Sequence, residues 1–300
     1  VSGVDGMVRW NDRVSDFNYF VGVNLTLARQ KTINNYGEVF LNAWDQYRWA
    51  QTNRWSNVKN GAVWMWETIG VFQTQEEIDN YPVNIDGANN VNLRPGDLIF
   101  KDVNGDGLID DYDKRPLGYA ATDYDWDSGN ANKNPLLSMG INLGFEYKGI
   151  DFAADFAGGF MNTFVGDWHV KYGIGTDQMG YVYNVIDSWQ HEDIFDTKSP
   201  WKRGKFPAVR SNNPSIRDWN DFYAKEINYL RLRNLVVGYT LPIKWTKKAL
   251  IQKLRVYFEG SNLLCWDSLN DFGFDPEISS VTGFDYPQHK VYTVGVNVTF

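Results

Sequence analysis

The sequence predicts an all-β fold, an antiparallel transmembrane β-barrel with long extracellular loops, from three observations. Several segments alternate between apolar and small or polar residues, as Tyr292–Phe300 does at the end of the chain. Aromatic residues make up 16% of the 300 residues, although the mean hydropathy is −0.44. Short and long connections follow each other in turn. Lipid-facing apolar residues, aromatic girdles, short periplasmic turns and long external loops are all typical of such barrels.

The alternating segments indicate seven strands, because successive side chains of a strand point to opposite faces. The alternation changes phase in the fifth strand, where a bulge near Asn234 restores a single apolar face. Asp151 and Asp155 fall on the polar face, which suits a watery lumen better than a dry sandwich core. The expected strands lie near 4–11, 17–27, 139–147, 150–156, 230–239, 254–263 and 292–300.

Seven strands do not close a bacterial single-chain barrel, which has an even number of strands. Either the sheet is incomplete or the long segment between the second and third strands supplies further strands. We favour the first interpretation, in which residues 1–300 are the C-terminal portion of a large outer-membrane barrel. Residues 30–137 then form a long extracellular insert.

Composition and motifs exclude several function classes. The sequence has no run of about 18 apolar residues, which a transmembrane helix would need. A net charge of −8 without a basic block argues against nucleic-acid binding. The single cysteine, Cys265, cannot form an intrachain disulfide. His169, His191 and His289 lack zinc-type spacing, and nucleophile-elbow, P-loop and dinucleotide motifs are missing, so no enzymatic activity is predicted.

The most specific chemical motif is the loop Asp102–Asp113. It matches the EF-hand calcium loop at positions 1, 3 and 5, at the turn glycine and at an acidic position 12. Because no helix pair flanks it, we expect a structural site rather than a switch. The metal is expected to be Ca²⁺, with Mg²⁺ as an alternative, and a metal-free turn is the other interpretation. The expected ligands are Asp102, Asn104, Asp106, the Leu108 carbonyl, Asp110 and Asp113.

Two long loops are rich in tryptophan beside amide and carboxylate side chains. Flat aromatic rings offer large apolar surfaces that stack on sugar faces. The alternatives are packing within the loops or contact with a partner protein. The candidate ligand contacts are Trp44, Trp49, Trp55, Trp168 and Trp189.

The segment Pro95–Asp110, which reads PGDLIFKDVNGDGLID, resembles the signature of SusC/RagA-like TonB-dependent transporters of Bacteroidota. Further stretches resemble the same family in the same order, so the resemblance covers essentially the whole chain. They are Gly70–Ile78, Tyr229–Leu235, Gly238–Pro242, Arg255–Tyr257, Asn262–Leu264, Gly273–Glu277 and Tyr292–Phe300.

The resemblance implies a plugged barrel in the outer membrane of a Gram-negative bacterium that imports a nutrient, a glycan fragment or a peptide. It also implies a SusD-like surface lipoprotein as a cap and TonB as the energy source. The plug, the TonB-contacting region and the N-terminal extension have no counterpart in these residues, so we expect only part of the transporter. Phe300 is expected to be the signal for the barrel assembly machinery. The rival hypotheses are a soluble or surface-displayed, calcium-stabilised carbohydrate-binding β module and a passive outer-membrane barrel.

Overall fold

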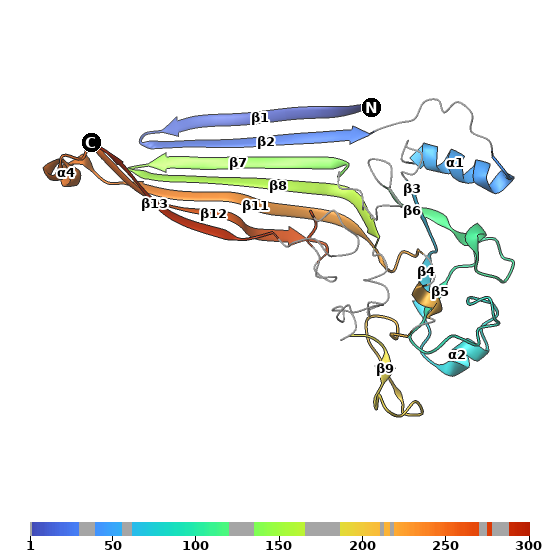
Figure 1. The fold of residues 1–300 in the computed structure, drawn as a ribbon. Coiled ribbons are helices and arrows are strands. Elements are labelled where there is room, and N and C mark those ends of the chain that lie inside the picture. Colours follow the sequence, from blue (N-terminus) through green and yellow to red (C-terminus); the bar gives the residue numbers. More distant parts are fainter. Residues whose placement is uncertain are drawn as a thin grey trace.

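The computed structural model describes residues 2–29, 40–55, 62–119, 135–165, 187–210, 213–216, 219–269, 275–277 and 288–300. It has two regions, an extended sheet and a compact group of loops at one end of the strands (Figure 1). Neighbouring strands of the sheet are all antiparallel, in the order β1-β2-β7-β8-β11-β12-β13. Their bounds are Ser2–Val14, Phe17–Arg29, Leu137–Tyr147, Ile150–Val165, Ala224–Thr240, Lys253–Asp267 and Val291–Thr299.

Each of the seven predicted strands is present, and the predicted bulge is confirmed. The register of β11 shifts between Leu232 and Asn234 against both of its neighbours. The short turns are tight for a local reason. Lys148 and Gly149, with φ of 46° and 89°, connect β7 to β8. Two successive residues with positive φ give a turn whose twist matches that of the flanking strands.

The two faces of the sheet differ in chemistry, as the alternation predicted. Val237, Phe258 and Val294 are aligned across three neighbouring strands, and Val294 remains 75% exposed. On the opposite face, Arg255 Nε donates to Asp151 Oδ1 at 2.9 Å. Since no apolar layer of the described chain covers the first face, its side chains need an apolar environment from elsewhere.

The loop region contains three small two-stranded sheets and several short helices. The sheets pair β3 with β6, β4 with β5 and β9 with β10, and none of them adds a strand to the large sheet. The alternative that the insert supplies further strands is therefore wrong for the described residues. The elements are α1 Ala43–Trp55, β3 Ala62–Met65, β4 Thr68–Val71, α2 Gln75–Asp79, β5 Leu98–Phe100, η1 Asp111–Asp113, β6 Arg115–Tyr119, β9 Gln190–His191, β10 Trp201–Lys202 and η3 Pro214–Ile216.

The hydrophobic core lies in the loop region. It brings together side chains of the insert, of the segment before β11 and of the nearby ends of β11 and β12. Its buried members are Trp66, Phe72, Ile78, Ile85, Leu93, Leu98, Phe100, Ile109, Phe206, Tyr223, Ile227 and Leu269.

In the described part of the chain, every helix is too short or too polar to cross a membrane.

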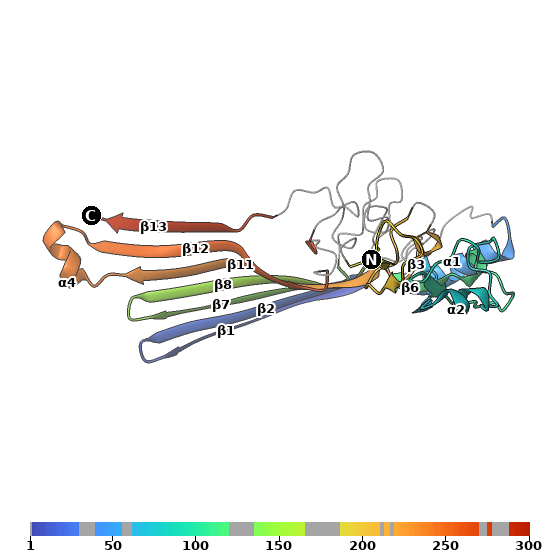
Figure 2. The same ribbon diagram turned by 90° about the horizontal axis from the view of Figure 1, so that it is seen from below.

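The chain turns back between β11 and β12 through α4 (Ile243–Thr246) and η4 (Lys247–Ala249). This turn, the two short turns and the C-terminus lie at the same end of the strands, opposite the loop region (Figures 1 and 2). Short turns and long loops are thus segregated to opposite ends of the sheet, as expected for a bacterial barrel.

Candidate metal loop and its surroundings

The predicted metal loop follows β5 and is closed by hydrogen bonds from its own backbone. Asp102 accepts from the Gly105 N–H at 2.6 Å and from the Gly107 N–H at 2.8 Å. Gly105 and Gly107 have φ of 77° and 79°, in the left-handed region that glycine adopts without steric cost. The two glycines therefore allow the chain to curl around the Asp102 carboxylate.

The loop is anchored to the hydrophobic core through Ile109, which is 1% exposed. The Ile109 N–H donates to the Asn84 carbonyl at 3.1 Å, and the Asn84 N–H donates to the Gly107 carbonyl at 2.8 Å. This pair of bonds makes a short parallel bridge between the loop and the segment before it. The apolar side chain at the eighth position of the loop thus fixes the loop's place in the fold.

Asp113, at the twelfth position, holds the two ends of the loop together. Its side chain is fully buried. Oδ1 accepts from the N–H groups of Val103 (2.8 Å) and Asn104 (3.4 Å), and Oδ2 accepts from the Asp110 N–H (2.9 Å). A buried carboxylate needs such partners, because an unpaired one would cost several kcal/mol.

The donor set fits a hard divalent cation in type and order, since Asp102, Asn104 and Asp106 all offer side-chain oxygens. A carboxylate oxygen that accepts one N–H keeps a second acceptor site. In this structure the oxygens face the loop's own donors: Asn104 Oδ1 accepts from the Asp106 N–H at 3.0 Å. The described residues contain no cluster of three or more His, Cys, Asp or Glu side chains arranged as metal ligands. A cation would therefore have to share these side-chain oxygens with the loop's own N–H donors, while Asp113 closes the loop.

A second acidic turn lies beside the metal loop and also binds its own backbone. Asp86 accepts from the N–H groups of Ala88 (2.7 Å), Asn90 (2.8 Å) and Asn92 (2.9 Å). Partial burial raises the pKa of Asp86, but the three N–H groups outweigh it and hold the pKa below its ordinary value of 3.8. The ionised carboxylate is thus part of the folded turn.

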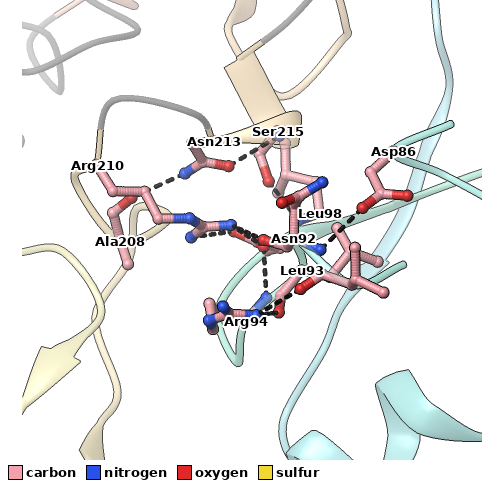
Figure 3. A network of polar contacts seen from close by, with 11 residues as sticks. Asp86, Asn92, Leu93, Arg94, Leu98, Ala208, Arg210, Asn213 and Ser215 are labelled. Atoms are coloured by element: carbon pink, nitrogen blue, oxygen red, sulfur yellow. Dashed lines mark hydrogen bonds and ion pairs between the residues drawn. The ribbon is translucent and has the colours of Figure 1, made fainter. Parts of the chain in front are cut away.

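A buried ion pair joins the insert to the segment before β11. Arg210 Nη1 donates to Asp97 Oδ1 at 2.9 Å, and Nη2 donates both to Asp97 Oδ2 and, at 3.0 Å, to the Asn92 carbonyl. The Arg94 N–H also donates to Asp97, at 2.7 Å. Figure 3 shows Arg210 directed from its own segment toward the backbone around Asn92 and Arg94. These contacts fix two segments that lie more than 100 residues apart in the sequence.

The network continues through Ser215 and Asn213. The Leu98 N–H donates to Ser215 Oγ at 2.8 Å, and the Ser215 N–H donates to Asn213 Oδ1 at 2.8 Å. Burial raises the pKa of Asp97, which is 0% exposed, while Arg210, the Arg94 N–H and Ser215 oppose the shift. Sequence analysis did not identify this network, because no local pattern pairs Asp97 with a distant arginine.

The aromatic candidates have different surroundings. Trp44, on α1, is half-buried and stacks on Tyr47 with 5.4 Å between ring centroids. The centroid of its ring also lies 5.3 Å from the ring centroid of Tyr112, which belongs to the metal loop. Trp49 and Trp55 lie on the same helix, but their side chains are outside the described part of the structure, as is all of Trp168. Trp44 therefore belongs to an aromatic cluster that borders the metal loop.

Trp189 is buried, with 5% exposure. Its indole covers Gly96, where an added Cβ would come within 2.4 Å of Trp189 Cγ. Gly96 also has a φ of 94°, which other residues rarely adopt. In this structure the ring packs on the backbone of the insert, and no open face is presented to a ligand.

A second charged network lies on the polar face of the sheet, near the loop region. Arg231, which is 4% exposed, pairs with Asp275 at 2.6 Å and with Glu277 at 2.7 Å. Arg233 also pairs with Glu277. These contacts attach the segment after β12 to β11.

At the opposite end of the strands, a cavity of about 670 Å³ is lined by Asn18, Phe20, Glu146, Asp151 and other residues.

Comparison with known proteins gives relatives of one kind. No protein-family model matches the chain. Among curated proteins, it is 27% identical over 224 residues to TonB-dependent receptor P3 of Formosa agariphila, and 26% identical over 249 residues to TonB-dependent receptor P26 of the same organism. These matches include 69% and 77% of this chain, but the chain spans only 19% and 22% of the two receptors.

Solved structures agree on the fold. The RagAB peptide importer in the open-open state matches 99% of this chain with a TM-score of 0.61 at 18% identity, and the chain covers 28% of that protein. The RagAB peptide transporter matches 99% with a TM-score of 0.58 at 21% identity, and 29% of it is covered. The relatives are receptors and importers rather than enzymes. The predicted all-β, outer-membrane barrel fold is confirmed.

Proposed function

We propose that this chain, which is part of a SusC/RagA-like TonB-dependent transporter of the outer membrane, takes part in the energy-coupled import of a nutrient. In this proposal residues 1–300 are the C-terminal portion of the barrel, and residues 30–137 form an extracellular insert. The plug and the segment that contacts TonB belong to the rest of the transporter.

The observation that carries the proposal is the match of almost the whole chain, sheet and loop region together, to one part of a peptide importer. The exposed apolar face of the sheet, with Val294 and its neighbours, further supports a barrel wall in lipid. The soluble carbohydrate-binding module loses support for the same reason, because it would need to cover that face. The passive barrel remains the alternative for the experiment to exclude.

The cargo and the cap are finer proposals. Two solved relatives are described as peptide importers or transporters, which supports a peptide, and the tryptophans of the insert support a glycan fragment as the other candidate. We propose a SusD-like lipoprotein as the partner at the loop end. Among the aromatic candidates, Trp44 is the described residue placed best to contact a ligand, since it is half-buried rather than covered.

Uptake by living cells tests the import proposal. Cells with and without the transporter that contains these residues are given labelled oligosaccharides and peptides, and uptake is measured with and without a protonophore. We expect uptake of one cargo class to require both the transporter and the proton-motive force. Uptake that requires the transporter but survives the protonophore would indicate a passive barrel.

We also propose that Phe300, which is 79% exposed at the C-terminus, is read by the barrel assembly machinery. Phe300→Ser is expected to reduce the amount of transporter inserted in the outer membrane several-fold, whereas Phe195→Ser, in an exposed loop, is expected to leave it unchanged. Heat-modifiable migration on gels, which distinguishes folded from unfolded barrels, measures the inserted fraction. Equal insertion of both variants would contradict this role.

A further inference from the structure

The turn between β11 and β12, residues 242–252, differs from the other turns at its end of the sheet. The strands β7 and β8 are joined by two residues, Lys148 and Gly149, and β1 and β2 by Ser15 and Asp16. The β11–β12 turn instead contains α4 and η4 and extends beyond the strand ends (Figures 1 and 2). A tight reversal needs only two residues, so the additional length needs another explanation.

The turn is ordered by hydrogen bonds of its own backbone. The Trp245 N–H donates to the Pro242 carbonyl at 2.9 Å, and the Leu250 N–H donates to the Lys247 carbonyl at 3.1 Å. The Gln252 N–H reaches the Thr299 carbonyl at 2.8 Å, which attaches the turn to β13. The side chains of the turn are therefore held in place on a defined backbone.

Large apolar side chains of this turn are exposed. Ile243, Trp245 and Leu250 have exposed fractions of 58%, 67% and 84%. Leu250 also has a φ of 60°, a conformation that glycine or asparagine adopts at lower cost. A leucine in this position lowers the stability of the backbone and leaves a large apolar side chain exposed to the surroundings.

The same turn concentrates positive charge in a chain whose net charge is −8. Lys244, Lys247 and Lys248 are exposed, as is Lys253, the first residue of β12. No Asp or Glu occurs from Thr240 to Phe258. In the described ranges, no ion pair involves Lys244, Lys247 or Lys248. Their charges therefore remain available for an anionic partner.

The turn continues the apolar face of the sheet at the end that carries the short turns, which is the periplasmic end in bacterial barrels. Tyr239, Val256 and Val296 are aligned across β11, β12 and β13 directly before the turn, and each is exposed by 38% or more. This row faces lipid in the outer-membrane fold. Beyond it a membrane presents headgroups, where tryptophan rings and lysine ammonium groups are stabilised.

We propose that residues 242–252 are an interfacial anchor that binds anionic phospholipid headgroups of the periplasm-facing leaflet. Lys244, Lys247 and Lys248 contact the headgroup phosphates, and Trp245 and Leu250 enter the boundary with the acyl chains. The partner is a lipid surface, because apolar and cationic groups are exposed together next to the lipid-facing row. The inference rests on the outer-membrane location and is independent of import.

Retention of anionic lipid tests the role of the lysine charges of the turn. The complete transporter is placed in nanodiscs of phosphatidylcholine with 30% phosphatidylglycerol, and co-purified lipid is counted by native mass spectrometry. The combined variant Lys244→Gln, Lys247→Gln and Lys248→Gln is expected to retain about tenfold less phosphatidylglycerol. The matched control replaces Lys198, Lys202 and Lys205, in the loop region, and is expected to retain as much as the wild type. Equal retention by both variants would overturn the proposal.

The depth of the turn in the membrane tests the role of its apolar side chains. This measurement does not use the lysine variant, so it remains decisive if that variant folds poorly. A nitroxide is attached to a cysteine at Leu250, in a cysteine-free background, and its collision rates with oxygen and with a water-soluble nickel complex are compared. A label at Ser15, on a short turn of the same end, is the control. We expect the label at position 250 to favour oxygen at least about fivefold more than the control, since oxygen concentrates in lipid. Equal exposure to nickel at both positions would place the turn in water, or against a protein, and would overturn the proposal.

Discussion

The sheet and the loop region of this chain are stabilised in different ways. In the loop region, Phe72, Phe100 and Leu98 are completely buried by residues of the same chain. In the sheet, Val8 and Trp10 on β1 and Val294 on β13 remain 62% to 76% exposed, and each of these two edge strands pairs with one neighbour along its length. The first region forms its own core, whereas the second leaves its apolar face exposed, as a barrel wall in lipid does.

This difference explains why side-chain hydrogen bonds to the backbone are concentrated in the loop region. Hydrogen bonds between strands satisfy the backbone of the five inner strands of the sheet without any core. The loops lack such regular pairing, so side chains such as Asp86, Asp97 and Asp113 bind the backbone N–H groups instead. Loops of this length stay ordered because a core and a set of buried carboxylates act together.

The largest expected effect comes from removing a core ring. Phe100→Ala should destabilise the loop region by about 3–5 kcal/mol, because it leaves a cavity that the packed neighbours cannot fill. Val294→Ala, on the exposed face of the sheet, should cost about 1 kcal/mol or less in detergent. Hydrogen exchange of loop and strand amides measures both. Similar losses at the two positions would contradict the division into two regions.

A somewhat smaller effect is expected at the buried ion pair. Arg210→Met should cost the loop region about 2–3 kcal/mol at pH 7, because it leaves the Asp97 carboxylate buried without its cation. Burial already raises the pKa of Asp97 above 3.8, and losing Arg210 raises it further. An acid whose pKa is higher in the folded state stabilises that state as the pH falls.

The pH dependence of the variant therefore has a definite sign. The loss caused by Arg210→Met should diminish as the pH falls below 7, because the buried Asp97 carboxylate takes up a proton. The double variant Arg210→Met, Asp97→Asn is the control and should show no such recovery. Proteolysis of the loop region at several pH values is the measurement. A loss that stays constant with pH would show that Asp97 remains ionised.

The smallest expected effect is that of the metal. Ca²⁺ at ten times its dissociation constant should stabilise the loop region by about 1.4 kcal/mol and leave the strands unchanged. Asp106→Asn should reduce this gain, while Asp79→Asn, on the exposed side of α2, should not. Protease sensitivity of the insert is compared in Ca²⁺, in Mg²⁺ and in chelator. Sensitivity that is the same in all three would refute the structural metal site.

Much of the sheet was predictable because its signals are local. Alternation placed all seven strands, and the phase change near Asn234 located the bulge. These patterns arise from the pleat of a strand, which repeats every two residues whatever the rest of the chain does. The start of α2 is equally local, because Thr74 accepts from the Glu77 N–H three residues later.

The candidate site was less predictable, because its decisive contacts are distant in sequence. Nothing near Asp97 indicates Arg210, and nothing near Arg231 indicates Asp275 or Glu277. Burial also depends on the fold: the sequence made Trp189 a candidate ligand contact, and the structure places its ring on Gly96. Spacing predicts which oxygens can surround a cation, but not that Asp113 would bind three backbone N–H groups.

The most direct test of the account is the intact mass of the native polypeptide that contains these residues, extracted from the outer membrane in mild detergent. Residues 1–300 account for 34.6 kDa. If they are the barrel portion of a TonB-dependent transporter, the mass will be several-fold higher, and a surface lipoprotein will co-purify. A polypeptide of about 34.6 kDa without a partner would contradict the account.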